Sequence, residues 1–273
     1  MAKAIFDTQL YQQKRKKSAP HWHKSDFLWT YMAKNIRERV YDTLRDYEYA
    51  LDIGTRLQYV PNTFTDNEKV KHWDTLDDYS LADQELMQNP PLKNNHYDLV
   101  TSLLNIHNIN NIQSEFKQYN QLLKSGGLMI ANFFGEDNLI ELRQALYKTE
   151  TEVLGGISPR ISPTITLNDA GNLLFMAGFK IPVADKETIT ISYSSPLAFL
   201  KDIQNMGESN MLINRLKQPK KPKEFIANLL NQLQEIAGND DGTLSITCEV
   251  ITITGWKDDG TMNPKTNPMG VTF

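Results

Sequence analysis

The sequence predicts an α/β fold on a mostly parallel sheet, and three observations support this class. Continuous apolar runs such as "YALDI" and "YDLVTSLL" are typical of strands buried on both faces. Segments with helical periodicity alternate with these runs through the first half of the chain, as in right-handed βαβ units. Later, "ETITISY" and "LSITCEVITITGW" alternate polar and apolar residues, which indicates antiparallel partners at one edge of the sheet.

The first elements follow from apolar spacing. A helix from about Ser25 to Tyr47 is predicted by an apolar residue at every fourth position: Leu28, Met32, Ile36, Val40 and Leu44. The strand Tyr49–Ile53 follows almost at once, and a second short apolar piece, "VKHW", ends at Asp74. The run at residues 97–104 is the next buried strand.

The remaining elements have clear start and stop signals. "NIQSEFKQYNQLLKSGG" predicts a helix that stops at Gly126–Gly127, and "LMIANFF" predicts another buried strand. A helix around Leu139–Leu146 leads to the loop "GGISPRISP", after which Thr166 or Asn168 opens a further helix. Two helices, around residues 197–206 and 225–236, lie between the two alternating strands.

Composition excludes several classes of protein. With 273 residues, 40% of them hydrophobic, the chain can bury one substantial core. A net charge of −4 gives no field that favours nucleic acid, and the basic run "KRKK" is typical of a solvated helix face. The single cysteine, Cys248, excludes an internal disulfide and lies in a strand pattern, so we expect a packed thiol.

The sequence also bears on location. No apolar run reaches the length of a membrane span, and the first residues lack the apolar core of a secretion signal. We therefore expect a cytoplasmic protein of bacterial type that does not span a membrane.

The end of the first strand is the predicted ligand site. In open α/β sheets, ligands bind beyond the carboxyl ends of the strands, which here places Asp52 and Gly54 at the site. Asp74 follows at the spacing of an acidic residue that accepts hydrogen bonds from ribose, although it could equally cap the next turn. The absence of G-x-G-x-x-G counts against a dinucleotide more than against S-adenosylmethionine, which has no phosphate.

The chain resembles the class I S-adenosylmethionine methyltransferases. Among them it is most similar to the mitochondrial complex I assembly factor 5 family (NADH:ubiquinone oxidoreductase assembly), and more distantly to the malonyl-carrier-protein methyltransferase of biotin synthesis. The segments that carry the resemblance run in family order from Ile5 to Lys257. They include "IFDTQLYQQKRKKSA", "ALDIG", "YDLVTSLLNIHNIN", "ETEVLGGISPRISP", "DIQNMGESN" and "ITGWK".

The resemblance implies a seven-stranded sheet of order 3-2-1-4-5-7-6 with one antiparallel strand. We expect the chain to divide into an N-terminal helical cover (1–47), a methyltransferase-like domain (48–257) with a helical insertion at about 195–238, and a tail (258–273). The glycine, proline and asparagine content of the tail predicts that it is flexible. The N-terminal helix, which bears Phe6, Asp7 and Gln9, would fold over the cofactor.

The resemblance also implies a pocket for S-adenosylmethionine. Asp74 would face the ribose and Asp83 the adenine, whereas the strand ends would form the floor. The cofactor residues implied are Asp52, Gly54, Asp74, Asp83, Ser102, Leu103 and Leu104.

The turn after Gly54 departs from the family pattern. The family has a glycine-rich turn, but Thr55, Arg56, Leu57 and Gln58 follow here, and a side chain at the second glycine position would crowd the cofactor. Two interpretations remain open. The chain is either an enzyme that uses S-adenosylmethionine or a catalytically silent relative that keeps the fold as an assembly chaperone.

Catalytic candidates near the strand ends are His107, Glu150 and Glu152, and Arg160 of the following loop is a further candidate. His107 could instead be satisfied by nearby backbone, and Glu150 and Glu152 could be solvated helix residues. The loop "GGISPRISP" is interpreted as a lid or substrate-docking segment in which Arg160 reaches an acidic partner. "MGESN" is either a simple C-terminal turn of a helix or a segment whose Glu208 and Asn210 meet that lid. "HWH" has no third ligand nearby, so no metal site is predicted.

The expected function is modification of a protein substrate. The resemblance to the family implies that this substrate is a subunit of complex I. Methylation needs mainly alignment and desolvation, whereas some family members are associated with arginine hydroxylation. A third possibility is carboxyl methylation of a substrate bound to a carrier protein.

Overall fold

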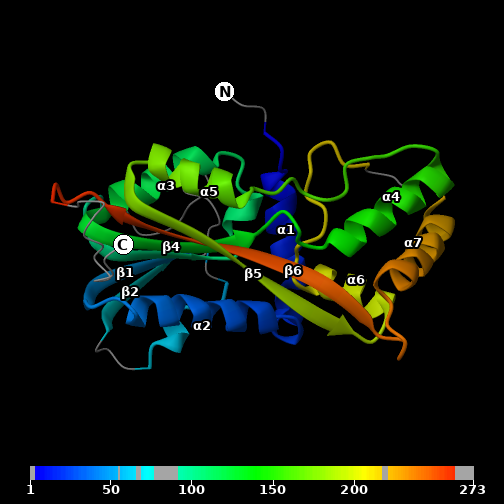
Figure 1. Ribbon diagram of the computed structural model, residues 1–273, viewed down its shortest axis with the longest axis horizontal. Coiled ribbons are helices and arrows are strands. Elements are labelled where there is room, and N and C mark those ends of the chain that lie inside the picture. The colour runs from blue at the N-terminus through cyan, green and yellow to red at the C-terminus, as the bar shows by residue number, and fades with distance from the viewer. Residues whose placement is uncertain (1–3, 55, 66–68, 77–91, 217–220, 262–273) are drawn as a thin grey trace. The chain divides into compact units, whose positions relative to one another are not determined.

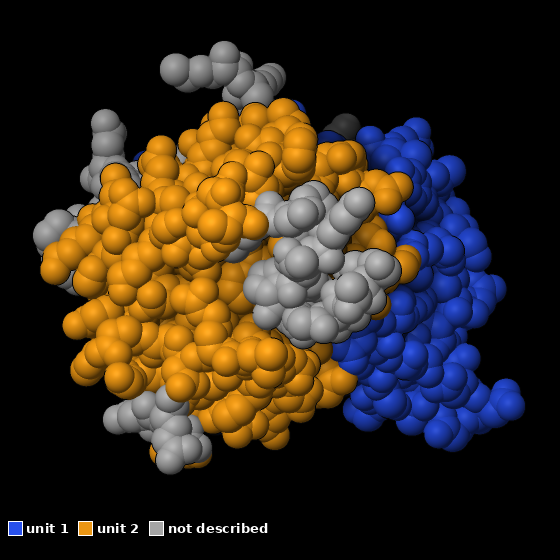
Figure 2. Space-filling view, turned by 60° about the vertical axis from the view of Figure 1, so that its left-hand side comes forward, with its two compact units in different colours: residues 1–27, 134–164, 187–250 blue, residues 28–133, 165–186, 251–273 orange. Residues whose placement is uncertain are grey.

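The computed structural model of the protein describes residues 4–54, 56–65, 69–76, 92–216 and 221–261. The chain forms two compact units, each assembled from separate stretches of sequence (Figure 2). The first, here called the sheet unit, comprises residues 28–133, 165–186 and 251–273. The second, the α4 unit, comprises residues 1–27, 134–164 and 187–250. The division into cover, domain and tail stays a prediction, and residues 262–273 of that tail lie outside the described residues.

Four parallel strands run through the described part of the sheet unit: β1 (Tyr47–Ile53), β2 (Val70–Leu76), β3 (Tyr97–Leu103) and β4 (Leu123–Phe134). Leu51 of β1 stands opposite Asp74 on one side and Val100 on the other. Ser102 of β3 pairs with Ala131 of β4. These registers bring the carboxyl ends of β1, β3 and β4 to the same edge, as the alternation of strands and helices predicts.

Two longer strands, β5 (Phe179–Tyr193) and β6 (Leu244–Lys257), complete the sheet in the order β2-β1-β3-β4-β6-β5. Their arrows run in opposite directions, which confirms the predicted antiparallel pair (Figure 1). The described residues thus contain six strands rather than the predicted seven. Along the chain, the strand numbered 3 in the prediction would fall after β2 and before β3. Residues 77–91 of that stretch lie outside the described residues.

Helices cover both faces of the sheet unit. α3 (Ile112–Leu122) and α5 (Leu167–Met176) lie on one side of the sheet, and α2 (Phe27–Tyr41) lies on the other (Figure 1). Phe116 and Tyr119 of α3 pack into a buried cluster with strand residues such as Leu51 and Met129. Burial of these large side chains from water is the main contribution to stability here.

Several element boundaries differ from the prediction, and the ends of two helices are examples. α2 ends at Tyr41 and β1 already begins at Tyr47, so Leu44 lies outside the helix and is 85% exposed. α3 ends at Leu122, and Gly126–Gly127 belong to β4 instead of stopping the helix. Apolar spacing and the positions of glycines do not show where a segment pairs with a neighbouring strand, because strand pairing depends on the tertiary structure.

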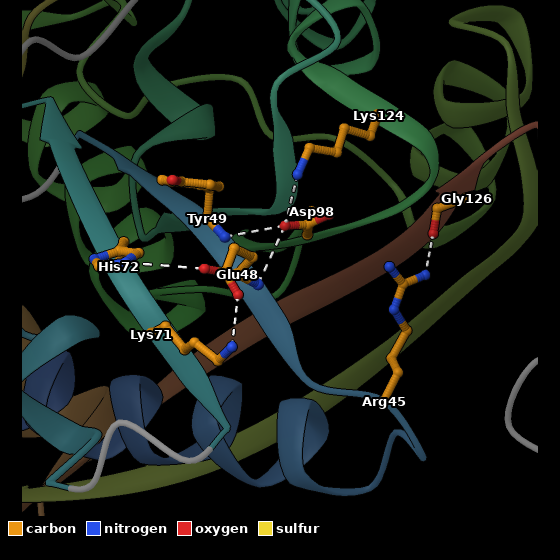
Figure 3. A network of polar contacts seen from close by, with 8 residues as sticks. All are labelled: Arg45, Glu48, Tyr49, Lys71, His72, Asp98, Lys124 and Gly126. Atoms are coloured by element: carbon orange, nitrogen blue, oxygen red, sulfur yellow. Dashed lines mark hydrogen bonds and ion pairs between the residues drawn. The ribbon is translucent and has the colours of Figure 1, made fainter.

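Polar contacts hold the amino ends of the strands together (Figure 3). The Asp98 carboxylate of β3 accepts hydrogen bonds from the backbone N–H groups of Glu48 and Tyr49, at 3.1 and 3.0 Å, and from Lys124 Nζ at 3.1 Å. Glu48 in turn pairs with Lys71 of β2 over 2.8 Å. This network joins four strands at the end of the sheet opposite the predicted ligand site.

The α4 unit has its own core. It contains α1 (Thr8–Ser18), α4 (Ile140–Leu154), α6 (Pro196–Asn205) and α7 (Pro222–Ala237), with the short 3-10 helix η1 (Ala19–Lys24) after α1. Ala145 of α4, Phe199 of α6 and Leu233 of α7 meet Leu244 and Ile246 of β6 in one buried cluster. Among the helices that the structure describes, none has the length and hydropathy of a membrane-crossing segment.

Candidate functional site

The turn after β1 is shaped around Gly54. Its φ is +76°, and its N–H donates to the Leu76 carbonyl at 2.8 Å. A Cβ at this position would stand 2.4 Å from Cγ of Asn105, which is 1% exposed. Only glycine tolerates both the left-handed backbone and so close a neighbour. The sequence predicts the glycine, but its contact with Asn105 cannot be predicted, because it forms only when the fold brings the ends of β1 and β3 together.

Asp52 is a fully buried carboxylate in β1. Its Oδ1 accepts a hydrogen bond from Thr101 Oγ1 at 2.7 Å, and the two residues stand opposite each other in the β1–β3 register. A buried carboxylate is costly unless it is hydrogen-bonded, and Thr101 supplies one such bond. The neighbouring strand therefore fixes the orientation of Asp52 just before the Gly54 turn.

The end of β3 forms the predicted floor of the site. Leu104 has φ of +46°, and its N–H donates to Oδ1 of Asn132 in β4 at 3.0 Å. Ser102 and Leu103 precede it as buried strand residues that pair with Ala131 and Asn132. Within the described part of the chain, the buried Nδ2 of Asn132 has no hydrogen-bond acceptor. This buried amide is therefore a donor that a polar ligand at the strand ends could satisfy.

Asp74 lies inside β2, two residues before its end, and its side chain is exposed. Its carboxylate accepts a hydrogen bond from the Tyr97 hydroxyl at 2.9 Å, and both residues line a cavity of about 250 Å³. Burial raises the pKa of Tyr97, and the bond to Asp74 raises it further. Asp83, the second predicted acidic residue, lies outside the described residues.

Two side chains, Arg56 and Gln58, replace glycines of the family pattern after Gly54. The Arg56 guanidinium lies 5.0 Å from the ring centroid of Trp29 in α2. Gln58 adopts φ of +54° and is exposed. A short 3-10 helix, Pro61–Thr63, is the helical element in the described part of this crossover. The contact with Trp29 gives Arg56 a cation–π partner within the same unit.

His107 lies in the short 3-10 helix η4 (Ile106–Asn108) after β3 and is 8% exposed. It belongs to the sheet unit, as do the described cofactor candidates, whereas Glu150 and Arg160 belong to the α4 unit. The structure thus brings Asp52, Gly54 and the β3 end together, and it forms a separate cluster around Glu150.

Glu150 orders the loop that follows α4. Its side chain is buried, and its two oxygens accept hydrogen bonds from the Ser158 N–H at 2.8 Å, from the Ser158 hydroxyl, and from Arg160 Nε at 2.6 Å. The predicted acidic partner of Arg160 is therefore Glu150, ten residues earlier in the chain. A carboxylate with this many donors is well placed to hold the loop in one conformation.

Two further contacts fix the same loop. The Arg160 guanidinium lies 4.3 Å from the Phe225 ring centroid of α7. The Asn210 Nδ2 donates to the Pro159 carbonyl at 3.0 Å, which confirms the predicted meeting of "MGESN" with the loop. The loop borders a cavity of about 590 Å³ in the α4 unit. The lining also includes residues of α4, of the first residues described and of the segment after α6: Ala4, Ile5, Arg143, Leu146, Tyr147, Leu212 and Asn214.

Comparisons with known proteins give the chain its relatives. Residues 44–131 match the family model described as a methyltransferase domain. Arginine-hydroxylase NDUFAF5, mitochondrial, of Homo sapiens is 33% identical over 270 residues, which cover 93% of this chain and 77% of that protein. Malonyl-[acyl-carrier protein] O-methyltransferase of Xylella fastidiosa is 30% identical over 166 residues, or 61% of this chain and 54% of that protein.

Among solved structures, an S-adenosylmethionine-dependent methyltransferase of Thermotoga maritima is 10% identical with a TM-score of 0.46, covering 91% of this chain and 100% of that chain. The relationship to the human protein extends through both compact units, well beyond the matched domain. The chain carries a class I S-adenosylmethionine methyltransferase domain and belongs to the NDUFAF5 family.

Proposed function

We propose that this protein binds S-adenosylmethionine at the turn after β1 and modifies a protein substrate. Asp52, Gly54 and the β3 end (residues 102–104) would hold the cofactor, with Asp74 at the ribose and Asp83 at the adenine. The observation that carries the proposal is the 33% identity to an arginine hydroxylase across 93% of the chain. The resemblance noted in the sequence adds a subunit of respiratory complex I as the class of partner.

The residues present at the turn fit such a cofactor. Gly54 keeps the left-handed conformation of a tight turn, and the buried Asn132 Nδ2 offers a donor that lacks an acceptor in the described part of the chain. The Arg56 guanidinium is engaged by the Trp29 ring, so its charge has a partner within α2. When bound, S-adenosylmethionine supplies an electrophilic methyl group on a sulfonium.

The acceptor that we propose is an arginine side chain of a protein, because the mammalian relatives are named arginine hydroxylases. Hydroxylation of such a side chain consumes an oxidant, whereas methylation consumes the cofactor itself. Glu150 is a poor candidate for the general base, because its two oxygens already accept hydrogen bonds from Ser158 and Arg160. We infer that Glu150 positions the loop and that His107 remains the candidate for proton transfer.

One observation favours a second function. The side chains at Arg56 and Gln58 replace the glycines of the family turn, which supports a silent relative that acts as an assembly chaperone. The match to a malonyl-carrier-protein methyltransferase supports a third, carboxyl methylation, over 61% of the chain.

Calorimetric titration of the full chain with S-adenosylmethionine tests the proposal. We expect saturable binding that weakens when Asp52 is replaced by Asn. Absence of binding at millimolar ligand would overturn the enzyme proposal and leave the chaperone. Incubation with isolated complex I subunits, followed by mass spectrometry, then distinguishes an added methyl group from an added oxygen atom. A methyl ester on a carrier-protein substrate would support the third function instead.

A further inference from the structure

The cavity of the α4 unit contains a small set of charged groups. Among the described residues that line it, the charged ones are Arg143 and Glu150 of α4 and Arg160 of the following loop. Arg143, Tyr147 and Glu150 are spaced at i, i+4 and i+7, which places them on one face of the helix. The two guanidinium groups thus meet the cavity from two different elements.

The carboxylate of Glu150 is committed to the protein itself. It accepts hydrogen bonds from the Ser158 N–H and from Arg160 Nε at 2.8 and 2.6 Å, and its side chain is 2% exposed. Its charge therefore compensates one of the two guanidinium groups. Since Arg143 and Arg160 carry two positive charges against this single negative one, the lining keeps one excess positive charge.

Both arginines retain donors. Arg160 uses Nε for Glu150, and its buried Nη2 has no acceptor among the described residues. Arg143 donates from Nη2 to the Glu136 carbonyl at 3.2 Å, and its buried Nε likewise has no acceptor in the described part of the chain. Neither guanidinium is therefore fully paired within the described part of the chain.

The rest of the lining is largely apolar, with Leu146, Ile157 and Ile161 beside the two prolines of the loop. A forked guanidinium matches the geometry of a carboxylate, and one excess charge balances one carboxylate better than a doubly charged phosphate. A substrate guanidinium would be repelled by the same two arginines.

We propose that this cavity binds a carboxylate carried on an apolar body, with Arg143 and Arg160 as its donors. The carboxylate belongs either to an acidic side chain of a protein segment or to a free apolar acid. The first source rests on the proposed function, since the segment would then belong to the protein substrate. Recognition of the carboxylate itself does not depend on that function.

Calorimetry on the full chain without S-adenosylmethionine tests the site. The probes are the capped peptide acetyl-Leu-Glu-Leu-amide, its Gln counterpart, and hexanoate. We expect the Glu peptide to bind about 10- to 100-fold more tightly than the Gln peptide, the range for hydrogen bonds to charged groups. Tighter binding of the Glu peptide than of hexanoate assigns the site to a protein segment, and the reverse assigns it to a free acid.

Arginine variants locate the binding. Arg143→Met and Arg160→Met should each weaken binding of the carboxylate probe by about tenfold or more. Lys148→Met removes the same charge from α4 outside the cavity lining and should leave affinity unchanged. Thermal unfolding tests whether each variant is folded. If Arg160→Met does not fold, the comparison of the Glu and Gln peptides on the unaltered chain decides whether the cavity recognises a carboxylate.

Equal binding of the Glu and Gln peptides, no binding of either carboxylate probe, or unchanged affinity in both folded arginine variants would overturn the proposal. The result is independent of cofactor binding. Binding of the carboxylate without binding of S-adenosylmethionine would support this site and overturn the enzyme proposal. Binding of S-adenosylmethionine without binding of the carboxylate would support the enzyme proposal and overturn this site.

Discussion

The side chain of Asn105 lies against Gly54 so closely that a Cβ at the glycine would stand 2.4 Å from Asn105 Cγ. The contact joins the turn after β1 to the residues that follow β3, within the same unit. It explains why this turn keeps its first glycine although the later ones are replaced. The later positions face other partners, such as Trp29 for Arg56.

Replacement of Gly54 by Ala should therefore destabilise the protein through two effects. The positive φ costs about 1–2 kcal/mol for a residue with a side chain, and displacement of the buried Asn105 adds about 1–3 kcal/mol. Gly242→Ala is the matched control, because Gly242 has φ of +82° but none of the described residues places an atom within 4 Å of an added Cβ. Urea unfolding measures both variants. Equal losses of stability would show that the contact with Asn105 contributes nothing.

Glu150→Gln should lower the free energy of unfolding by about 2–4 kcal/mol, because it leaves Arg160 without its buried charged partner. The lower part of the usual range is expected since the Arg160 side chain is 19% exposed. Glu152→Gln, on an exposed position of the same helix, should stay within about 0.5 kcal/mol. Denaturant titration compares the two, and similar small effects would mean that the loop is held by its other contacts.

Lys14 should make the protein more stable as pH rises from about 8 to 10.5. Desolvation by burial, aided by the charge of Arg215, lowers the pKa of Lys14 from 10.5 to about 8. Between these values the unfolded chain binds a proton that the folded chain has released, so the free energy of unfolding increases with pH.

The difference in unfolding free energy between the unaltered chain and Lys14→Gln isolates this contribution. Lys14 Nζ lies 2.9 Å from the Ser209 carbonyl and 2.7 Å from that of Asn210, so the variant also loses those bonds at every pH. The pH-dependent part of the difference is the test. A flat or falling difference over this interval would show that Lys14 titrates at its ordinary pKa.

Cys248 should not react with a thiol reagent in the folded protein at pH 8. The thiol is 2% exposed, and burial raises its pKa from 9.0 to about 12. Because the thiolate is the reactive form, both access and ionisation oppose the reaction. Labelling with Ellman's reagent should be absent under native conditions and complete in urea. Since the chain has a single cysteine, any rapid native labelling would contradict this directly.

Much of the fold can be predicted from the sequence because long apolar runs and helical spacing are strong local signals. The strands that contain "YALDI", "YDLVTSLL" and "LMIANFF" are present, and Thr166 caps α5 by accepting a hydrogen bond from the Asp169 N–H at 3.1 Å. Boundaries are less well predicted. The end of α2 and the start of β4 depend on pairing with neighbouring strands, which no local pattern contains.

The candidate site divides in the same way. Asp52 and Gly54 can be recognised from a strand that ends in an acidic turn, and Arg160 from its place in a loop stiffened by prolines. Thr101, Asn105 and Asn132 carry no such signal, because single polar residues near strand ends are common. Their importance depends on the register that sets them beside Asp52, Gly54 and Leu104.

The sequence by itself determined the α/β class, the parallel strands with an antiparallel pair at the edge, and the turn at Asp52–Gly54. Only the tertiary structure decided that Asn105 closes over that glycine, that Trp29 engages Arg56, and that Glu150 holds Arg160 and Ser158 beside a cavity. The physical reason is the range of the interactions. The pattern of apolar residues and its period can be recognised within a short stretch of sequence. The partners of a side chain depend instead on contacts between segments that are far apart in the chain.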